Sequence, residues 1–441
     1  MKFLSTRGSS PAVSFGEALT QGLAPDGGLY VPERWPSIPL DAFDGASELP
    51  DVANVLLRPF VAGDAIAGEI ASVTREAFNF PAPLVPVTPD GRLSVLELFH
   101  GPTAAFKDFG ARFLAACMQR LRAGAARPLN ILVATSGDTG GAVAAAFHRR
   151  PGVVVSVLFP KGLVSPTQER QLTCWGDNVH SFRVSGSFDD CQRLVKQAFV
   201  DAGLRAKFEL SSANSINLGR LLPQAVYYAA TSLAVHRRHG VAPDFIIPSG
   251  NLGNSVACVL AKQLGLPIGR IVLAHNANRA VPDFLQSGEW KPRPGVPTLA
   301  SAMDVGTPSN MERLRALFPG IEALRSAVRA ESVTDAEIQK RVAADYNQYG
   351  KVWCPHTATA AEVYARMKRE EQGNSLSGGR WILVATAHPA KFREIVEPLI
   401  GQRIEMPESL AKLFSRPVSS VDLQPELAAL AGALNTTVGK I

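Results

Sequence analysis

One lysine of this sequence lies in a setting where lysine is seldom found. The stretch FHGPTAAFKDFGARF, from Phe99 to Phe113, places Lys107 between Phe106 and Phe109 at the expected start of a helix. Lysine is among the residues least often buried. Either its stem covers the aromatic rings while the amine reaches water, or the amine lies in an apolar pocket. Burial would lower the pKa of the amine and make it nucleophilic.

A glycine-rich loop offers a place for an anion. PSGNLGN, Pro248 to Asn254, follows an apolar run and precedes a helical pattern. Gly250 and Gly253 allow backbone N–H groups to point inward, and the following helix adds the positive end of its dipole. Such a loop can cradle a phosphate. It matches neither the GxGxxG pattern of dinucleotide sites nor the P-loop pattern, and a tight turn without a ligand is the alternative.

Two further loops carry polar side chains at the ends of predicted strands. TSGDTGG, Thr135 to Gly141, combines hydroxyls with exposed N–H groups at a helix start, which suits a carboxylate ligand. Asp138 could instead cap that helix. ATAHPAKF, Ala385 to Phe392, ends a strand in Thr386 and His388, and His388 could be a general base or a core histidine. No second histidine or cysteine stands at ligand spacing, so we predict no metal site.

These features together indicate one cofactor. Pyridoxal phosphate needs a phosphate cup, an amine for a Schiff base, and a nearby place for the carboxylate of an amino acid. The loop at Pro248 to Asn254, the amine of Lys107 and the loop at Thr135 to Gly141 could supply these three. The spacing of these residues does not identify the reaction.

The loops follow strands that repeat along the chain. Strand–loop–helix units are predicted at 129–150, 244–265 and 380–400, with a further buried strand within 152–162. Continuous apolar strands that alternate with helices are typical of parallel sheets covered on both faces. Ligands of such sheets bind beyond the carboxyl ends of the strands. We therefore expect an α/β protein with two doubly wound, mostly parallel-sheet domains after an irregular N-terminal region.

Length and composition limit the remaining classes. The 441 residues exceed one ordinary core, and 46% hydrophobic with 19% charged residues describe a globular protein. The net charge of +6 is modest for this length, and the basic cluster HRRHG (236–240) lacks interleaved aromatic residues, so we predict no nucleic-acid partner. An anionic small substrate suits the charge equally well.

Cysteines and termini indicate the compartment. The five cysteines are odd in number and contain no CxxC pair, which fits a reducing cytoplasm. The sequence MKFLSTRGSS at the start lacks the apolar region of a signal peptide. No apolar run reaches the ~20 residues of a membrane-spanning helix. We expect a soluble, cytoplasmic protein with no membrane partner.

Over nearly its whole length, the sequence resembles the bacterial and fungal threonine synthase family. These enzymes belong to the fold-type II, or tryptophan-synthase-β-like, enzymes that use pyridoxal phosphate. The resemblance is carried, in the order of the family, by STRG (5–8), SFGEALTQGLAPDGGLYVPE (14–33), ELFHGPTAAFKDFGARF (97–113), TSGDTGGA (135–142), SSANSINLGRLLPQ (211–224), PSGNLGN (248–254) and ATAHPAKF (385–392).

The resemblance implies roles for particular residues. Lys107 would hold the cofactor as a Schiff base and move protons, and Thr386 would bond the pyridine nitrogen. Many fold-type II enzymes have asparagine where this chain has Asp138, whose carboxylate would need a shared proton beside the cofactor's phenolate oxygen. The cofactor phosphate would lie on Gly250, Asn251, Leu252, Gly253 and Asn254. The substrate carboxylate and the cofactor's 3′ oxygen would lie on Ser136, Gly137, Asp138, Thr139 and Gly140. The substrate phosphate would lie on Asn214, Ser215, Asn217 and Arg220.

The side-chain chemistry of this last group suits a phosphate, because a forked guanidinium with hydroxyl and amide donors favours that anion. An ordinary surface arginine is the alternative for Arg220.

The resemblance also implies domains and a reaction. The expected parts are an N-terminal region (1–96), a first, smaller α/β domain with the lysine (97–214), and a second, larger α/β domain (215–441). The reaction would be that of a carbon–oxygen lyase acting on phosphates, which converts O-phospho-L-homoserine and water to L-threonine and phosphate. A phospho-lyase that releases 2-oxobutanoate from the same substrate is the first alternative, and a catalytically silent binding module is the second. Monomer and homodimer both stay open.

Overall fold

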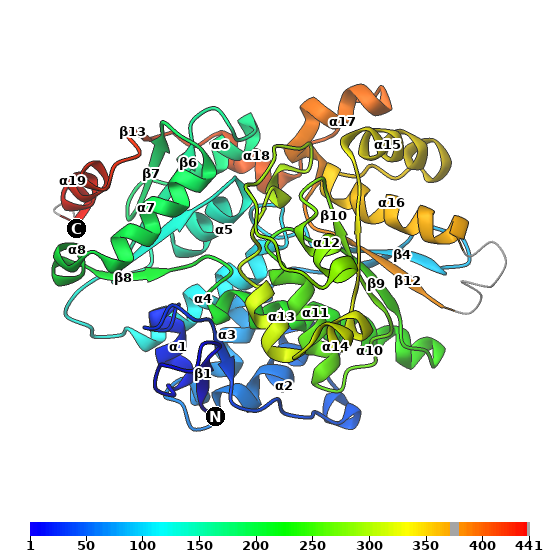
Figure 1. The fold of residues 1–441 in the computed structure, drawn as a ribbon, viewed down its shortest axis with the longest axis horizontal. Coiled ribbons are helices and arrows are strands. Elements are labelled where there is room, and N and C mark those ends of the chain that lie inside the picture. The colour runs from blue at the N-terminus through cyan, green and yellow to red at the C-terminus, as the bar shows by residue number, and fades with distance from the viewer. Residues whose placement is uncertain (371–378, 439–441) are drawn as a thin grey trace.

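The computed structural model describes residues 1–370 and 379–438 of the chain. Two parallel-stranded lobes lie side by side, and the N-terminal region packs below them in the view of Figure 1. The expected α/β architecture with a preceding N-terminal region is confirmed.

The larger sheet has six strands in the order β11-β10-β9-β12-β4-β3. All neighbours are parallel except β3 and β4, which are antiparallel. Alternate residues of β9 enter two cores: Phe245 and Ile247 join the core under α10 and α11, and Ile246 joins the core under α16. This burial on both faces explains the continuous apolar runs. The bounds are β3 Leu84–Pro86, β4 Leu93–Glu97, β9 Asp244–Pro248, β10 Ile271–His275, β11 Arg329–Ser332 and β12 Trp381–Ala385.

Helices cover this sheet on both faces. They are α10 Ala225–His239, α11 Gly253–Gln263, α12 Ala280–Ser287, α13 Met311–Leu317, α14 Ile321–Ala327, α15 Asp335–Tyr349, α16 Pro355–Glu370 and α17 Arg393–Ile400, with short 3₁₀ turns η3 Leu222–Gln224, η4 Ser301–Met303 and η5 Pro389–Phe392.

The smaller sheet has five parallel strands in the order β13-β7-β6-β5-β8. Its strands are β5 Leu129–Ala134, β6 Val153–Pro160, β7 Val179–Val184, β8 Glu209–Ser212 and β13 Val421–Leu423. Its helices are α5 Asp138–Phe147, α6 Pro166–Thr173, α7 Phe188–Val200, α8 Ala202–Lys207, α18 Glu408–Phe414 and α19 Leu427–Val438. Figure 1 shows α19 beside α7, so the C-terminal segment crosses the molecule to close this lobe.

The N-terminal region packs against the helix that begins at Lys107, α4 (Lys107–Leu121). It contains the antiparallel pair β1 Phe3–Ser5 and β2 Tyr30–Pro32, helices α1 Phe15–Gln21, α2 Leu49–Val61 and α3 Ile70–Ala77, and turns η1 Leu40–Phe43 and η2 Ala67–Glu69. A short helix, α9 (Leu218–Leu221), packs against both α4 and α1.

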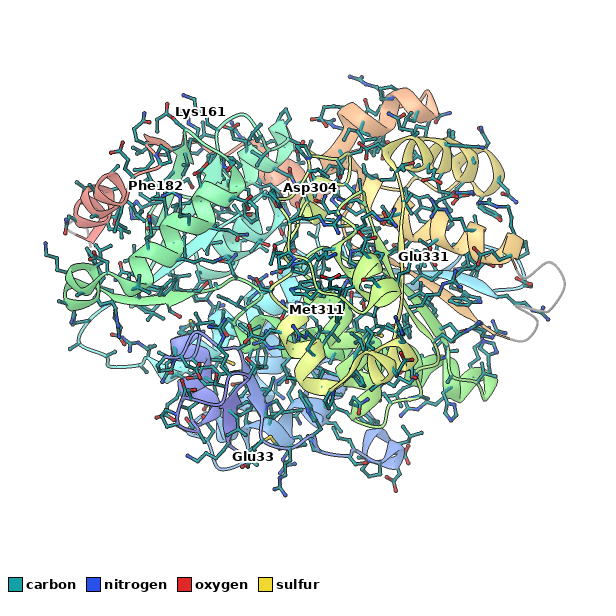
Figure 2. All side chains as sticks on the ribbon, in the orientation of Figure 1. Glu33, Lys161, Phe182, Asp304, Met311 and Glu331 are labelled. Carbon is teal, nitrogen blue, oxygen red and sulfur yellow. The ribbon has the colours of Figure 1, made fainter. Side chains whose placement is uncertain are left out.

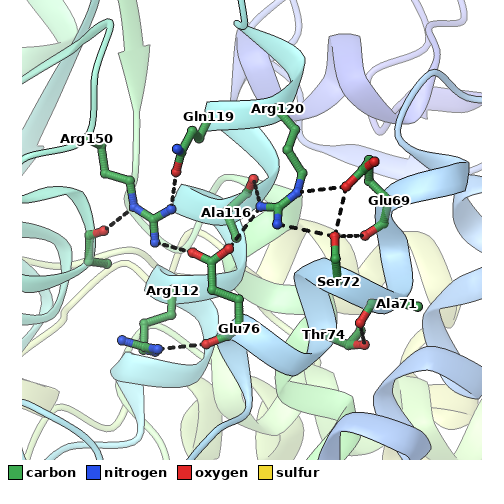
Figure 3. Close-up of polar contacts among 11 residues, drawn as sticks. Glu69, Ala71, Ser72, Thr74, Glu76, Arg112, Ala116, Gln119, Arg120 and Arg150 are labelled. Carbon is green, nitrogen blue, oxygen red and sulfur yellow. Dashed lines mark hydrogen bonds and ion pairs between the residues drawn. The ribbon is translucent and has the colours of Figure 1, made fainter.

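A polar network ties α3 to α4 (Figure 3). The carboxylate of Glu76 accepts from Arg120 of α4 at 3.0 Å and from Arg150, just after α5, at 2.5 Å. Arg112 of α4 donates to the backbone oxygen of Glu76 at 2.7 Å. Glu69 accepts from Arg120 at 3.3 Å. The network therefore fixes the lysine helix against both the N-terminal region and the smaller lobe.

The sheets draw strands from both sides of the expected domain boundaries. β4 ends at Glu97, and it pairs with β12 in the larger sheet. β13 begins at Val421, and it pairs with β7 in the smaller sheet. The division into 1–96, 97–214 and 215–441 stays a prediction about sequence segments, and the lobes themselves are not contiguous in sequence.

None of the helices in the described ranges is long and apolar enough to cross a membrane. All five cysteines are buried and unpaired. In the same part of the chain no group of three or more potential ligands could hold a metal ion.

Candidate active site

A cavity lies between the lobes, at the carboxyl ends of β5, β9 and β12. Asp304 and Met311, labelled near the centre of Figure 2, belong to segments that flank this region, and Met303 lines the cavity itself. The cavity brings together most of the residues expected to form a site. They are Lys107, Ser136, Asp138, Thr139, Asn214, Ser215, Arg220, Gly250, Asn251, Leu252, Gly253, Asn254 and Thr386.

Lys107 is the first residue of α4 and faces the cavity. Its Nζ lies 5.6 Å from the centre of the Phe106 ring. Burial lowers the pKa of this amine to about 8, and the positive charges of Arg220 and Lys391 act in the same direction, while Asp138 opposes them. The interpretation as an amine held in a pocket therefore fits, and that of a surface lysine does not.

Phe109, the other aromatic neighbour of Lys107 in the sequence, does not line the cavity. Its ring packs against those of Phe80 at 4.4 Å and Tyr227 at 5.3 Å, within the core. Only Phe106 of the two flanking aromatic residues lines the cavity.

The loop at Pro248 to Asn254 joins β9 to α11. Leu252 has a φ of +62° immediately before the helix, a backbone conformation that costs energy for any residue other than glycine. A Cβ on Gly250 would lie 2.7 Å from the Cα of Met303, so only glycine fits there. Strained backbone held by close packing is typical of a loop shaped for a ligand.

Asn254 presents a free donor to the cavity. Its Oδ1 accepts from the hydroxyls of Tyr227 at 2.5 Å and Tyr228 at 2.8 Å. The other amide atom, the buried Nδ2, has no partner. The side chain of Asn251 is instead occupied, because it donates to Ser215 at 2.7 Å and accepts from the N–H of Ser309 at 2.5 Å.

Asp138 does not cap its helix through a side-chain bond to the backbone. It follows the N-cap residue Gly137, and its Oδ1 lies 2.8 Å from the amine of Lys391 and 3.1 Å from the amide nitrogen of Gln168. Burial alone would raise the pKa of Asp138, but the charges of Lys391 and Lys107 outweigh burial and hold it below its usual value. Asp138 is thus an ionised carboxylate in the cavity wall.

The neighbouring glycines shape the loop and do not line the cavity. Gly137 has a φ of +136°, and a Cβ there would lie 2.4 Å from the side chain of Gln168. A Cβ on Gly140 would lie 2.5 Å from Thr135 and 2.6 Å from Leu172. Both positions let the chain turn closely into α5.

Arg220 is a buried cation without an anion. It is 2% exposed, one guanidinium nitrogen donates to the backbone oxygen of Ala213, and its Nε has no partner. No carboxylate of the described residues lies within ion-pair distance of it, and burial lowers its pKa to about 10. The alternative of a surface arginine is therefore wrong. Asn217 caps α9 through the N–H of Gly219 at 2.9 Å and lies outside the cavity lining.

His356, which lines the cavity, and Lys391, which lies beside it, were not predicted from the sequence as site residues. His356 of α16 accepts from the N–H of Ala302 through Nε2 at 3.1 Å, so its proton is on Nδ1, which is buried and has no partner. Burial lowers its pKa to about 4, so the ring is neutral near pH 7. Lys391, which bonds Asp138, is fully buried. His388, the histidine singled out by its motif, accepts from Ala390 and lies outside the lining.

The cavity fits an anionic cofactor that bears a carbonyl group. Three buried donor atoms without partners belong to lining residues: Nδ2 of Asn254, Nε of Arg220 and Nδ1 of His356. Buried donors are rarely left unbonded unless a ligand or water meets them. Lys107 adds an amine of lowered pKa, and the carbonyl oxygen of Thr386 fixes the lysine segment by accepting from Phe106 at 2.9 Å.

Comparison with known families gives the same cofactor. Residues 2–78 match the family described as threonine synthase N terminus, and residues 79–386 match that of pyridoxal-phosphate-dependent enzymes. Residues 357–433 match the family described as threonine synthase, C-terminal.

Curated relatives and solved structures match over nearly the full length. The threonine synthase of Escherichia coli K12 is 40% identical over 98% of both chains, and that of Serratia marcescens is 40% identical over 95% and 96%. The structure of threonine synthase from Brucella melitensis with pyridoxal phosphate bound superposes with a TM-score of 0.89 at 35% identity, covering 99% of both chains. The Escherichia coli structure gives 0.88 at 38%, covering 99% of this chain and 100% of that one.

These matches cover every segment that forms the cavity. A maize serine racemase, at 15% identity and a TM-score of 0.52, shares the fold alone. In length, in sequence and in the arrangement of its lobes, the chain belongs to the threonine synthases, a family of enzymes that depend on pyridoxal phosphate.

Proposed function

We propose that this protein converts O-phospho-L-homoserine and water to L-threonine and inorganic phosphate. The observation that carries the proposal is that one cavity contains both the Lys107 amine and the guanidinium of Arg220, a buried cation with no carboxylate partner. One serves a cofactor carbonyl, and the other serves an anionic group of the substrate. The membership of the family and the 40% identity to curated threonine synthases support the same reaction.

The cofactor would lie across the cavity between the two lobes. When bound, pyridoxal phosphate supplies an aldehyde for an amine and an electron sink for the carbon that loses a proton. The backbone of Gly250 to Asn254, at the start of α11, would hold its phosphate, and Nδ2 of Asn254 would add a donor. The Thr386 hydroxyl would face the ring nitrogen. A hydroxyl cannot hold a proton on that nitrogen as a carboxylate can.

The substrate would lie between the start of α5 and the segment that carries Asn214, Ser215 and Arg220. The turn from Ser136 to Gly140 begins α5. The N–H groups of Gly137 and Gly140 donate to the hydroxyl of Thr135, so the other N–H groups of the turn and the hydroxyls of Ser136 and Thr139 suit the substrate carboxylate. Asn214, Ser215 and Arg220 line the same cavity and would hold the phosphate that leaves. Because Arg220 has no carboxylate partner, a doubly charged phosphate would supply its missing counter-charge.

Lys107 would move the protons. With a pKa of about 8, a useful fraction of this amine is neutral near pH 7 and can accept a proton at Nζ. His356 is neutral in the same range and can donate a hydrogen bond from Nδ1, but the N–H of a neutral imidazole is too weakly acidic to act as a general acid.

Product analysis tests the reaction. Purified protein loaded with pyridoxal phosphate is incubated with O-phospho-L-homoserine, and threonine, phosphate and 2-oxobutanoate are all measured. Equal amounts of threonine and phosphate are expected. 2-oxobutanoate in place of threonine would identify a phospho-lyase, and no turnover at all would indicate a silent binding module. Lys107→Ala should abolish product formation.

Arginine variants test the phosphate position. We expect Arg220→Ala to raise KM for O-phospho-L-homoserine by about tenfold to a hundredfold, since a charge-assisted pair is worth about 1.5–3 kcal/mol. Arg220→Lys should recover part of the loss. Arg238→Ala, on the exposed end of α10, is the matched control and should leave KM unchanged. An unchanged KM in Arg220→Ala would remove this residue from the phosphate site.

We further propose a cytoplasmic location and a small molecule, rather than nucleic acid or a membrane, as the partner. The five unpaired, buried cysteines support a reducing compartment. Fractionation of the source cells, with the protein detected by antibody, tests the location.

A further inference from the structure

A second lysine lies beside the cavity, fully buried. Lys391, in the turn η5 that follows β12, places its Nζ 2.8 Å from Oδ1 of Asp138 and 3.0 Å from the backbone oxygen of Thr103. Both side chains of the ion pair are buried, with 0% and 4% exposed. Such a pair is costly to form, and removing one partner leaves an uncompensated charge.

The pair joins three segments that meet at Lys107. Asp138 begins α5 in the smaller lobe, Lys391 follows β12 of the larger sheet, and Thr103 stands four residues before Lys107. The backbone oxygen of Thr103 also accepts from Gln171 at 2.9 Å. Lys391 therefore contacts both the carboxylate in the cavity wall and the segment that leads into the lysine helix.

The charges near the Lys107 amine can be named. Asp138 on α5 is negative, while Arg220 on α9 and Lys391 on η5 are positive. His356 on α16 is neutral because burial lowers its pKa to about 4. Asp108, next to Lys107 on α4, bonds the N–H and hydroxyl of Thr103 at 2.8 and 2.6 Å, and burial raises its pKa. Lys391 thus opposes the nearby carboxylate that would favour a protonated Lys107.

We propose that Lys391 is a positioning residue of the site: it neutralises Asp138, so that this carboxylate does not hold the Lys107 amine in its protonated form. The role rests on the proposed function in one respect only, that Lys107 is the amine which takes up pyridoxal phosphate. Without Lys391, the carboxylate of Asp138 keeps its bond from Gln168 but loses its counter-charge. Without Asp138, the ammonium of Lys391 keeps its bond to Thr103 but loses its counter-charge. Without both, the balance of charge returns.

The test is a double-mutant cycle with Lys391→Met and Asp138→Asn, which keep the length of each side chain. The full chain is freed of cofactor, pyridoxal phosphate is added, and the rate at which the visible absorbance of the bound cofactor returns is followed against pH. This rate requires a neutral Lys107, so the midpoint of its rise reports the proton affinity of the amine.

The two single variants should shift the midpoint in opposite directions. From a midpoint of about 8 in the wild type, Lys391→Met should move it upward by about one pH unit, a tenfold slower uptake below the midpoint. Asp138→Asn should move it downward. The double variant should return close to the wild-type midpoint. Lys412→Met, which removes an exposed paired lysine of α18, is the control and should change nothing.

Several results would overturn the proposal. In one, Lys391→Met keeps the wild-type midpoint although its thermal unfolding is altered. That result would leave Lys391 with a purely structural role. If Lys391→Met fails to fold, Asp138→Asn and the double variant still decide, because equal midpoints in these two would mean that the Lys391 charge does not reach Lys107. A wild-type protein that gains no visible band with pyridoxal phosphate would instead contradict the proposed function.

Discussion

The tautomer of His356 follows from one backbone contact. Because Nε2 accepts from the N–H of Ala302, the proton of the neutral ring lies on Nδ1, and this atom has no partner. A buried N–H left unbonded costs about 1–3 kcal/mol. The cost is recovered if a ligand in the cavity accepts from it, so His356 stabilises the loaded state more than the empty one.

Replacement of His356 by phenylalanine should weaken ligand binding. The ring would still pack on Phe392, whose centre lies 4.8 Å away, but the donor would be lost. We expect about a tenfold rise in the dissociation constant of pyridoxal phosphate or in KM. The effect should be constant from pH 6 to 9, since the ring titrates near 4. His388→Asn, which keeps an acceptor for Ala390, serves as the control; an equal effect there would contradict the assignment.

At the scale of single residues, the sequence predicted which loops form the site better than which side chains contact each other. Lys107, Thr386 and the glycine loop carried local signals, and they line one cavity. Lys391 lies in the ATAHPAKF stretch, but a lysine six residues beyond the end of β12 gave no sign that it would meet Asp138. That contact joins positions 138 and 391, and only the fold brings them together.

Among the elements, α4 and α9 approach unusually closely. A Cβ on Gly110 would lie 2.4 Å from the backbone oxygen of Arg220, so the two helices meet through glycine. Lys107 and Arg220, the two ends of the proposed site, are therefore positioned by one contact. Backbone atoms cannot move aside as a flexible side chain can, so a larger residue would separate the helices.

Gly110→Ala should cost stability and cofactor affinity together. Overpacking of this kind costs about 1–3 kcal/mol, and displacement of α4 should weaken the binding of pyridoxal phosphate by about tenfold or more. Thermal unfolding and a cofactor titration measure the two effects. Gly432→Ala, in α19 with open space around it, should be neutral or stabilising by up to ~1 kcal/mol. Equal effects of the two substitutions would rule out the close approach as the cause.

The network of Figure 3 gives the lysine helix a pH-dependent support. Burial would raise the pKa of Glu76, but Arg150 and Arg120 outweigh burial and lower it. A lowered pKa adds stability above the unfolded value of 4.5, and this stability is lost as the pH falls through the folded value. Glu76→Gln should therefore reduce the free energy of unfolding at pH 7 by about 1 kcal/mol.

Urea denaturation at several pH values measures this loss. The difference between the wild type and Glu76→Gln should shrink as the pH falls below about 4.5. Glu69→Gln is the graded control, since Glu69 is 57% exposed and pairs with Arg120 alone. A larger loss from Glu69 than from Glu76 would contradict the role given to the more buried carboxylate.

On the scale of the whole molecule, the sequence predicted strands but not which sheet each strand joins. The apolar runs that became β5, β6, β9 and β12 were recognisable because burial on both faces leaves no polar alternation. β13 has three residues, two of them exposed, and carries no such signal. Its place beside β7 depends on a pairing across more than two hundred residues, and local patterns do not encode that distance.

The C-terminal segment completes the core of the smaller lobe. Leu430 of α19 is fully buried, in a cluster with Leu158 of β6, Phe182 of β7 and Leu423 of β13. Leu430→Ala should lower the free energy of unfolding by about 2–5 kcal/mol, from lost burial and the cavity left behind. Urea denaturation measures this loss, while product formation per folded molecule should stay unchanged, since Leu430 does not line the active-site cavity.

Leu163→Ala, at a leucine that is 65% exposed, is the matched control and should have an effect within about 0.5 kcal/mol. If Leu430→Ala unfolds at the same urea concentration as the wild type, α19 only rests on the lobe and does not stabilise it. If it lowers turnover without lowering stability, the C-terminal segment acts on the site through the smaller sheet, because β5 of that sheet ends at the cavity wall.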